Sequence, residues 1–322
     1  MKIGCCTDIS LLNRTAYTIS QFVPVSCQSP LSLPSACEPK FGPSFVTETA
    51  RVLDQTGLAQ HTYRVRLHAP EIARRIVPGQ FLMVRLPDRH DPLLARPFAL
   101  YDICVDSLGE PYGIEFVYHV VGKATTLLSQ LANKDRLEVW GPLGNGFPAP
   151  TGGRLFCMGG GIGYTPFLAV AREALCLRRY GPTRKPPRTD VTLCYGVRSK
   201  SDRADLSDFH NLGRDMDIQI ATDDGTEGHA GYVTDLLKQA LQSGSPPDRV
   251  YVCGPEPMMR AAATICLAAK IPCWVSLETP MACGFGVCFS CVTKIVVDTE
   301  PGWDYRRTCI EGPVFSASEL VW

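Results

Sequence analysis

Four cysteines near the C-terminal end constrain this chain more than any other feature. Cys283, Cys288 and Cys291 follow the spacing C-x4-C-x2-C, and 17 residues separate Cys291 from Cys309. Three thiolates from one short loop and a fourth from a distant segment are the ligand set of a [2Fe–2S] cluster of the plant-ferredoxin spacing type. The spacing therefore predicts that this part of the chain folds around two iron atoms.

The residues between these cysteines support a tightly bent loop. Gly284 and Gly286 adopt positive φ at little cost, so the loop is free to wrap a cluster. A structural zinc site is the first alternative, but such sites usually present two C-x2-C pairs and only Cys288/Cys291 has that spacing. A disulfide framework is the second, but it is typical of short secreted chains, and we recognise no signal peptide in these 322 residues.

Length, charge and cysteine usage narrow the class of protein. A chain of 322 residues is long enough for two or three domains, each with a buried core. Lys plus Arg equals Asp plus Glu at 32 each, which gives no indication of nucleic acid or an anionic membrane as a partner. No run reaches 18 apolar residues, so no transmembrane helix is predicted. The chain has 15 cysteines; apart from the four near the C-terminal end, most lie in apolar runs, where they pack as small hydrophobes, and this usage predicts a reducing cytoplasm.

The first 44 residues differ from the rest. Residues 1–44 are rich in Ser, Thr and Pro and show neither helical nor strand periodicity. We predict a disordered extension, with a misplaced translation start as the alternative. A second metal site is disfavoured, because no pair among Cys5, Cys6, Cys27 and Cys37 has C-x2-C spacing.

Residues 45–149 alternate strand-like runs with turns and are predicted to form a small antiparallel barrel. The predicted strands are 62–69, 79–87, 96–104, 112–120 and 135–142, with one helix at 123–132.

Residues 150–277 alternate strands with helices, the pattern of a doubly wound parallel sheet. The predicted strands are 154–160, 190–197, 216–222, 249–255 and 272–278, and the helices are near 166–180, 231–242 and 256–269. Residues 278–322 form a third, small domain that carries the cysteine loop and a short strand at 291–298. The fold class is therefore multi-domain, all-β followed by α/β.

Two segments of the α/β region resemble nucleotide-binding turns. In GGGIGYTPF (159–167) a glycine-rich turn follows a strand, so a pyrophosphate can approach the backbone and the next helix. Thr165 is predicted to cap that helix and Pro166 to occupy its first position. The spacing is not GxGxxG, so a simple tight turn stays open. In CGPEPMM (253–259), Cys253 ends a strand where a nicotinamide would lie, with a buried cysteine before a helix as the alternative.

Two segments of the barrel offer phosphate and ring contacts. RPFAL (96–100) places Arg96 to pair with a cofactor phosphate, and Phe98 with the Ala99 backbone to lie along a flat ring. A surface arginine before a core strand is the common alternative. GKATT (122–126) offers amides and hydroxyls to a second phosphate, or is an ordinary helix cap.

In this order, these segments resemble the ferredoxin-reductase superfamily, in which a flavin barrel precedes a nicotinamide-binding domain. ETPMACGFGVCFSCV (278–292) and RTCIEGPVF (307–315) resemble, more closely, the electron-transfer subunits of class 1B dihydroorotate dehydrogenases. The likeness covers residues 45–322. It implies an FAD-binding barrel at 45–149, an NAD-binding domain at 150–277 and a [2Fe–2S] domain at 278–322.

The resemblance also implies site residues, position by position. For FAD they are Arg96, Pro97, Phe98, Ala99, Val117, Tyr118, His119, Ala124 and Thr125. For the nicotinamide coenzyme they are Gly160, Gly161, Gly163, Thr165, Cys253, Gly254 and Pro255. For the cluster they are Cys283, Cys288, Cys291 and Cys309. The chain departs from the family at Ala99, where a hydroxyl normally faces the flavin, and at Ala124, which replaces a glycine.

The implied function is half of an enzyme. Dihydroorotate would be oxidised on FMN in a separate catalytic subunit, within a heterotetramer, and electrons would pass through the cluster and FAD to NAD⁺ in pyrimidine biosynthesis. No catalytic acid or base is expected in this chain. The closest alternative is a flavin and iron–sulfur subunit of a hydrogenase or ferredoxin-linked reductase, and a zinc-holding binding module is a more distant one. Arg198, Lys200 and Arg203 leave NADP open, although NAD is favoured.

Overall fold

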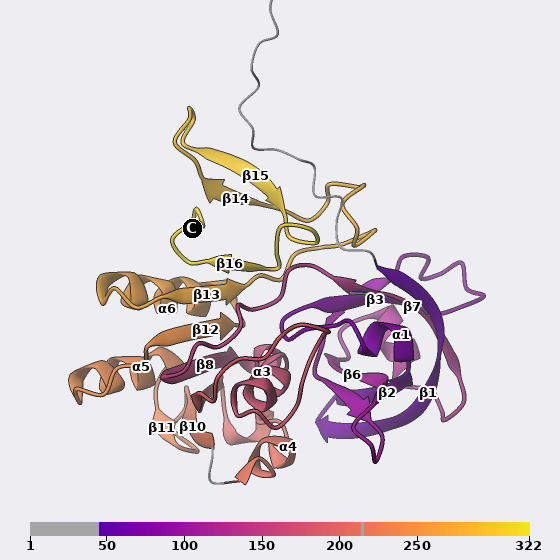
Figure 1. The fold of residues 1–322 in the computed structure, drawn as a ribbon, viewed down its shortest axis with the longest axis horizontal. Coiled ribbons are helices and arrows are strands. Elements are labelled where there is room, and N and C mark those ends of the chain that lie inside the picture. Colours follow the sequence, from indigo (N-terminus) through magenta and orange to yellow (C-terminus); the bar gives the residue numbers. More distant parts are fainter. Residues whose placement is uncertain (1–44, 214–215) are drawn as a thin grey trace, which may run out of the picture. The chain divides into compact units, whose positions relative to one another are not determined.

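The computed structural model describes residues 45–213 and 216–322. The predicted extension at 1–44, with its cysteines, lies outside the described residues. Two seven-stranded sheets and one two-stranded sheet make up the described fold (Figure 1).

The first sheet is antiparallel and forms a half-barrel with the strand order β4-β3-β7-β1-β2-β6-β5. Its strands are β1 (Val46–Ala59), β2 (Thr62–His68), β3 (Phe81–Arg85), β4 (Arg96–Ala99), β5 (Asp102–Val105), β6 (Pro111–His119) and β7 (Arg136–Leu143). Two short helices accompany it, α1 (Pro70–Ala73) and α2 (Lys123–Leu128). Apolar side chains from alternate strand positions, among them Val65, Leu82 and Phe116, fill its interior.

The second sheet has the order β11-β10-β9-β8-β12-β13-β16, parallel except at β16. Its strands are β8 (Arg154–Gly160), β9 (Asp190–Val197), β10 (Met216–Thr222), β11 (His229–Ala230), β12 (Arg249–Cys253), β13 (Cys273–Ser276) and β16 (Val314–Ser316). The helices are η1 (Gly161–Tyr164), α3 (Phe167–Ala174), η2 (Lys200–Asp202), α4 (Ser207–His210), α5 (Val233–Gln242) and α6 (Glu256–Ala268).

Two apolar cores cover the two faces of this sheet, because side chains alternate between faces along each strand. On one face, Leu155 and Leu193 pack against Phe167 and Phe209 of α3 and α4, together with Tyr101 of the half-barrel. On the other face, residues of α5 and α6 pack against the remaining strand positions. The half-barrel and the parallel sheet therefore share a core on the α3 side.

The C-terminal segment returns to the parallel sheet. After β13, the cysteine loop leads into a hairpin of β14 (Val292–Val296) and β15 (Trp303–Arg307), and β16 then pairs antiparallel with β13. Figure 1 shows this yellow segment beside β13.

Several predicted boundaries are corrected. The predicted strand at 96–104 is two strands, β4 and β5, because the chain turns at Leu100 and Tyr101. The helix predicted near 166–180 ends at Ala174. The long first strand, β1, was not among the predicted runs.

Candidate functional site

The four cysteines of the C-terminal segment converge although they come from two loops. Cys291 and Cys309 are buried, Cys283 is half-buried and Cys288 is exposed. The thiol of Cys309 hydrogen-bonds with that of Cys291 and lies near Cys283, and burial followed by these neighbours raises the pKa of Cys309 to about 12. The thiol of Cys288 in turn lies within hydrogen-bonding reach of Cys283.

The thiol of Cys288 has a lowered pKa. Its Sγ lies 3.1 Å from Ser290 Oγ. Hydrogen bonds from Ser290, and then from Cys283, lower the pKa of Cys288 to about 6. A thiolate is the form that binds metal, so this side chain is prepared as a ligand at neutral pH.

The loop backbone has the sharp bends that the sequence predicts. Gly284 and Gly286 have φ of 80° and 88°, and Phe289 also has a positive φ of 56°. A Cβ on Gly284 would lie 2.5 Å from Met83 Cγ, and one on Gly286 would lie 2.7 Å from Ile310 Cγ1. Both glycines are therefore required by their dihedral angles and by the side chains that pack against them.

The donor set fits an iron–sulfur cluster. It contains four thiols and a backbone amide of Gly286 that hydrogen-bonds Cys309. Within the part of the chain that the structure describes, no three His, Cys, Asp or Glu side chains are grouped to hold one ion. A two-iron cluster does not require such a group, because each iron takes two protein thiolates.

The cysteine loop packs directly on the half-barrel. Trp140 Nε1 of β7 donates a hydrogen bond to the Cys283 carbonyl at 3.1 Å. Cys291 and Cys309 share an apolar cluster with Phe81 and Met83 of β3. Pro97 and Ala99 of β4 lie opposite Met83 and Phe81 in the sheet register. Cross-strand partners project to the same face, so the loop lies on the face of the sheet to which Pro97 and Ala99 belong.

The residues expected to contact FAD in strand β4 are all half-buried. Arg96 Nη1 donates to the Leu94 and Ala95 carbonyls at 3.0 and 3.1 Å. The Phe98 ring stacks on Phe116, with centroids 4.7 Å apart, so one face of that ring belongs to the barrel core.

Strand β6 carries three further residues expected to contact FAD, and they differ in how far they are buried. Val117 and Tyr118 of β6 are buried, whereas His119 is exposed and its Nδ1 lies 2.9 Å from Thr62 Oγ1. His119 is therefore the one side chain of this expected trio that solvent reaches.

Helix α2 accommodates both expected residues without strain. Ala124 is buried inside the helix and is not among the positive-φ residues, so the change from glycine to alanine costs no backbone strain. Thr125 Oγ1 accepts hydrogen bonds from the Val121 and Gly122 amides at 3.0 and 3.1 Å and donates to the Gly122 carbonyl. Its hydroxyl closes the first turn of the helix, as in the capping alternative.

The two predicted nicotinamide motifs lie against each other. β8 and β12 are neighbours, with Gly159 opposite Cys253. A Cβ on Gly163 would lie 2.3 Å from the Cys253 carbonyl oxygen, and a Cβ on Gly254 would lie 2.9 Å from Gly160 N. The motifs meet at the carboxyl ends of β8 and β12, where the strand order reverses and ligands bind in such sheets.

The helix cap predicted after the glycine turn is wrong. α3 begins at Phe167 with Pro166 as its N-cap residue, and no side chain caps it. Thr165 instead has helical dihedrals at the end of η1, and its amide bonds the Ile162 carbonyl.

Sequence reasoning missed the neighbours of Cys253. Burial, and then the Glu278 carboxylate, raises the pKa of Cys253 to about 12, while a hydrogen bond with Ser276 opposes the shift. Cys253 is therefore a neutral thiol at pH 7. Ser276 ends β13, the strand next to β12. It lies opposite Cys253 in the register of these two strands, and only a correct strand pairing could have predicted this contact.

Comparisons with known proteins also indicate an iron–sulfur domain and an NAD-binding domain. Residues 278–321 match the family described as iron-sulfur cluster binding domain of dihydroorotate dehydrogenase B, and residues 157–264 match the oxidoreductase NAD-binding domain. The chain is 37% identical to a "Dihydroorotate dehydrogenase B (NAD(+)), electron transfer subunit" of Desulforamulus reducens, covering 85% of this chain and 97% of that protein. It is 36% identical to the protein of the same name from Bacillus caldolyticus, covering 85% and 98%. The chain belongs to this family of electron-transfer subunits.

Solved structures extend the likeness to the fold of this electron-transfer subunit. An NADH-dependent reduced ferredoxin-NADP oxidoreductase aligns with a TM-score of 0.70 at 25% identity, covering 85% of this chain and 90% of that one. A cytochrome P450 reductase from Amycolatopsis aligns at 0.57 and 27% identity, covering 71% and 68%. None of the helices in the described residues is long and apolar enough to cross a membrane.

Proposed function

We propose that this chain carries electrons between NAD(H) and a dihydroorotate-oxidising partner subunit in pyrimidine biosynthesis. Its relatives, 33–37% identical across most of the chain, are named as electron-transfer subunits of NAD⁺-dependent dihydroorotate dehydrogenase B. The partner is an FMN-containing catalytic subunit, and the assembly is a heterotetramer. The observation that carries the proposal is the packing of the cysteine loop on β3, next to the strand proposed to bind FAD.

Three groups of residues hold the three redox centres in this proposal. Cys283, Cys288, Cys291 and Cys309 hold the [2Fe–2S] cluster. Arg96, Pro97, Phe98, Ala99, Val117, Tyr118, His119, Ala124 and Thr125 line the FAD site. Gly160, Gly161, Gly163, Thr165, Cys253, Gly254 and Pro255 line the nicotinamide site. FAD, when bound, supplies the exchange between the electron pair of a hydride and the single electrons that a cluster carries.

The protein contributes position and exclusion of water. Trp140 anchors the cysteine loop through the Cys283 carbonyl, and buried Cys291 and Cys309 shield one side of the cluster site among apolar side chains. Cys288 is exposed on the other side. This asymmetry supports an inner side that faces the flavin strand and an outer side that exchanges electrons with a partner.

NAD is favoured over NADP by the charges after β9 and β10. The Arg203 guanidinium forms an ion pair with Glu227 at 2.8 Å. The Asp224 amide bonds the Arg198 carbonyl, so the exposed Asp224 lies beside this basic loop. Hydrogen bonds from Thr226 hold the pKa of Asp224 below its usual range. An additional 2′-phosphate would meet an ionised carboxylate here, whereas the ribose 2′-hydroxyl of NAD is compatible with one.

A cytoplasmic location is part of the proposal. The described residues contain eleven cysteines, and none of these forms a disulfide. Free thiols in this number are typical of a reducing compartment.

The test of the proposed function is Cys288→Ser, with Cys176→Ser as an exposed-cysteine control outside the site. We expect Cys288→Ser to retain FAD and NADH-dependent dye reduction, and to lose dihydroorotate-dependent NAD⁺ reduction with the catalytic subunit. The control is expected to retain both activities. Unchanged activity of the assembled Cys288→Ser complex would remove the cluster from the pathway. Absence of iron in the wild-type protein by elemental analysis would support the zinc alternative.

A second candidate has one supporting observation. The likeness to an NADH-dependent reduced ferredoxin-NADP oxidoreductase supports a flavin and iron–sulfur subunit that serves a ferredoxin-linked reductase. Affinity purification of the full chain from its own cells separates the two. Recovery with an FMN-containing dihydroorotate-oxidising subunit supports the first proposal, and recovery with a ferredoxin-linked flavoprotein supports the second.

A further inference from the structure

Two consecutive residues connect the half-barrel to the parallel sheet. Tyr101 and Asp102 follow β4, the strand proposed to bind FAD, and Asp102 is the first residue of β5. Both are buried, with 0% and 1% of their surface exposed. Their side chains bond to two different segments of the nicotinamide-binding half, so they differ from residues that only fill a core.

Asp102 accepts hydrogen bonds on both carboxylate oxygens. Tyr180 Oη donates to Oδ1 at 2.5 Å, and Arg172 and Arg178 both donate to Oδ2. Arg178 also donates to the Ile103 carbonyl at 2.7 Å. A buried carboxylate is costly unless it is paired and hydrogen-bonded, and all of its side-chain partners here come from the other half. Arg172 belongs to α3, the helix that follows the glycine turn.

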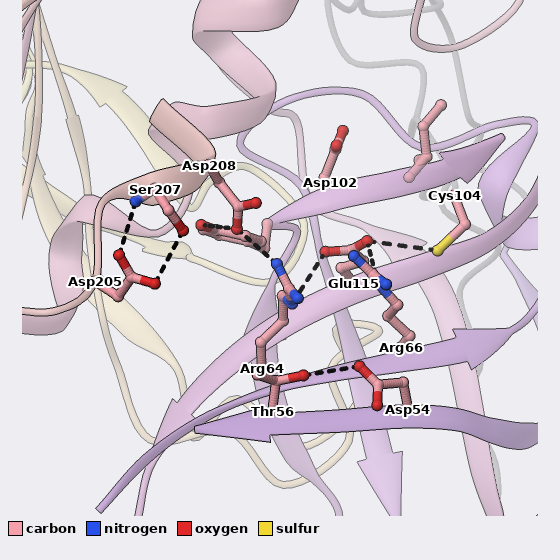
Figure 2. Close-up of polar contacts among 12 residues, drawn as sticks. Asp54, Thr56, Arg64, Arg66, Asp102, Cys104, Glu115, Asp205, Ser207 and Asp208 are labelled. Atoms are coloured by element: carbon pink, nitrogen blue, oxygen red, sulfur yellow. Dashed lines mark hydrogen bonds and ion pairs between the residues drawn. The ribbon is translucent and has the colours of Figure 1, made fainter. Parts of the chain in front are cut away.

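Tyr101 bonds to a different helix, α4. Its hydroxyl donates to Asp208 Oδ2 of α4 at 2.9 Å, and Arg64 Nη1 of β2 donates to the same oxygen at 2.6 Å. Figure 2 shows Arg64 between Asp208 and Glu115, with Asp102 nearby. The Tyr101 ring also meets Tyr164 of the glycine turn edge to face, with centroids 6.5 Å apart.

We propose that Tyr101 and Asp102 are positioning residues that fix the nicotinamide-binding half against the flavin strand. One dipeptide is bonded to α3 and α4, and its aromatic ring contacts the glycine turn that lies between β8 and α3. Hydride transfer requires reacting atoms about 3–3.5 Å apart, and a misplacement of about 1 Å costs on the order of 100-fold in rate. A charged, fully hydrogen-bonded contact selects one relative orientation more sharply than apolar packing, which tolerates sliding. This inference rests on the proposed placement of FAD and NAD.

The test compares Asp102→Asn and Tyr101→Phe with Glu138→Gln. Asp102→Asn keeps the shape and removes the charge, and Tyr101→Phe removes one oxygen. Glu138→Gln is the control, because Glu138 pairs with Arg85 and both residues belong to the half-barrel, so this ion pair does not connect the two halves. The readouts are NADH-dependent dye reduction with NADH and 4-deuterated NADH, FAD content, and hydrogen–deuterium exchange of residues 100–105 and 172–181.

For both interface variants we expect kcat to fall on the order of 10–100-fold while KM for NADH changes less than about threefold. The deuterium isotope effect on kcat should rise, because hydride transfer becomes the slow step. Hydrogen–deuterium exchange should increase in both peptides, with FAD content unchanged. The control should match the wild type in every readout.

Two outcomes overturn the inference. If the interface variants show faster hydrogen–deuterium exchange but a normal kcat and a normal isotope effect, the contacts of Tyr101 and Asp102 have only a structural role. The inference is also overturned if Tyr101→Phe has wild-type values in all readouts. If Asp102→Asn loses FAD, Tyr101→Phe alone is used as the test. If the wild-type protein itself binds FAD but does not oxidise NADH, the proposed function fails instead, and the exchange data still report whether the two halves are held by this contact.

Discussion

Glu173 is a buried carboxylate of α3 whose ionisation opposes folding. Its side chain pairs with Arg184 at 2.8 Å, but Oε1 has no hydrogen-bond partner. Burial raises the pKa of Glu173 from 4.5 to about 7, against the opposing effect of Arg184. The folded state therefore holds a proton that the unfolded state has lost between pH 4.5 and 7, so stability falls as pH rises through this window.

Glu173→Gln should remove this dependence. Gln resembles the protonated acid, so we expect the variant to match the wild type near pH 4.5 and to be more stable by about 1–3 kcal/mol at pH 8. The measurement is the urea midpoint of each protein from pH 4.5 to 8. Glu256→Gln, an exposed carboxylate of α6 paired with Arg260, is the control and should keep the wild-type slope. Parallel slopes for wild type and Glu173→Gln would contradict the assignment.

Individual residues were predictable where their chemistry needs only local sequence. The cysteine spacing and the bent loop at Gly284 and Gly286 depend on neighbours within a few positions, and the structure has both features. The role of the Thr125 hydroxyl and the neighbours of Cys253 depend on hydrogen bonds and strand register, which residue type does not determine. The partners of Asp102 come from α3 and the segment that follows it, about 70 residues further along the chain, and had no signal in the sequence.

Among the elements, the glycine turn after β8 is the one most closely tied to the proposed coenzyme site. A Cβ on Gly163 would lie 2.3 Å from the Cys253 carbonyl oxygen, a backbone atom that cannot rotate away. We expect Gly163→Ala to push the turn from Cys253 and raise KM for NADH about tenfold or more, since backbone approach is what a glycine-rich turn provides.

The matched control for that change is Gly57→Ala. Gly57 lies in β1, a Cβ added there would meet no atom within 4 Å, and the residue is not among the positive-φ glycines. This variant should bind NADH as the wild type does. FAD content and circular dichroism distinguish a local shift from misfolding. A Gly163→Ala protein with normal KM for NADH would show that the turn does not contact the coenzyme.

Elements were predictable where apolar runs are short and bounded. β8, β9 and β10 begin and end where the sequence predicts, because buried parallel strands read as continuous apolar runs. β1 was missed because most of its positions are half-buried or exposed and its sequence is rich in polar residues. β4 and β5 were merged because the turn between them contains apolar residues, Leu100 and Tyr101, that are buried.

At the scale of the whole molecule, the cysteine loop presents an apolar surface around the exposed Cys288, a proposed cluster ligand. Phe285, Val287 and Phe289 are 39%, 70% and 62% exposed and flank Cys288. Phe285 stacks on Phe45 at 5.4 Å, and the Arg307 guanidinium lies 5.2 Å from the Phe289 ring centroid. Exposed apolar groups gathered beside a redox centre are typical of a surface that a partner covers.

Val287→Asp should therefore weaken assembly with the catalytic subunit. A charge buried without a partner at an interface costs about 1–3 kcal/mol or more, which corresponds to a loss of roughly tenfold to 100-fold in affinity. Leu108→Asp is the control, because Leu108 is 86% exposed in the β5–β6 turn. Both variants should keep iron content and NADH-dependent dye reduction, while Val287→Asp alone raises the Kd measured by titration with the catalytic subunit. Equal affinities for the two variants would place the partner on another face. Loss of iron in Val287→Asp alone would instead show that this side chain supports the fold of the cysteine loop itself.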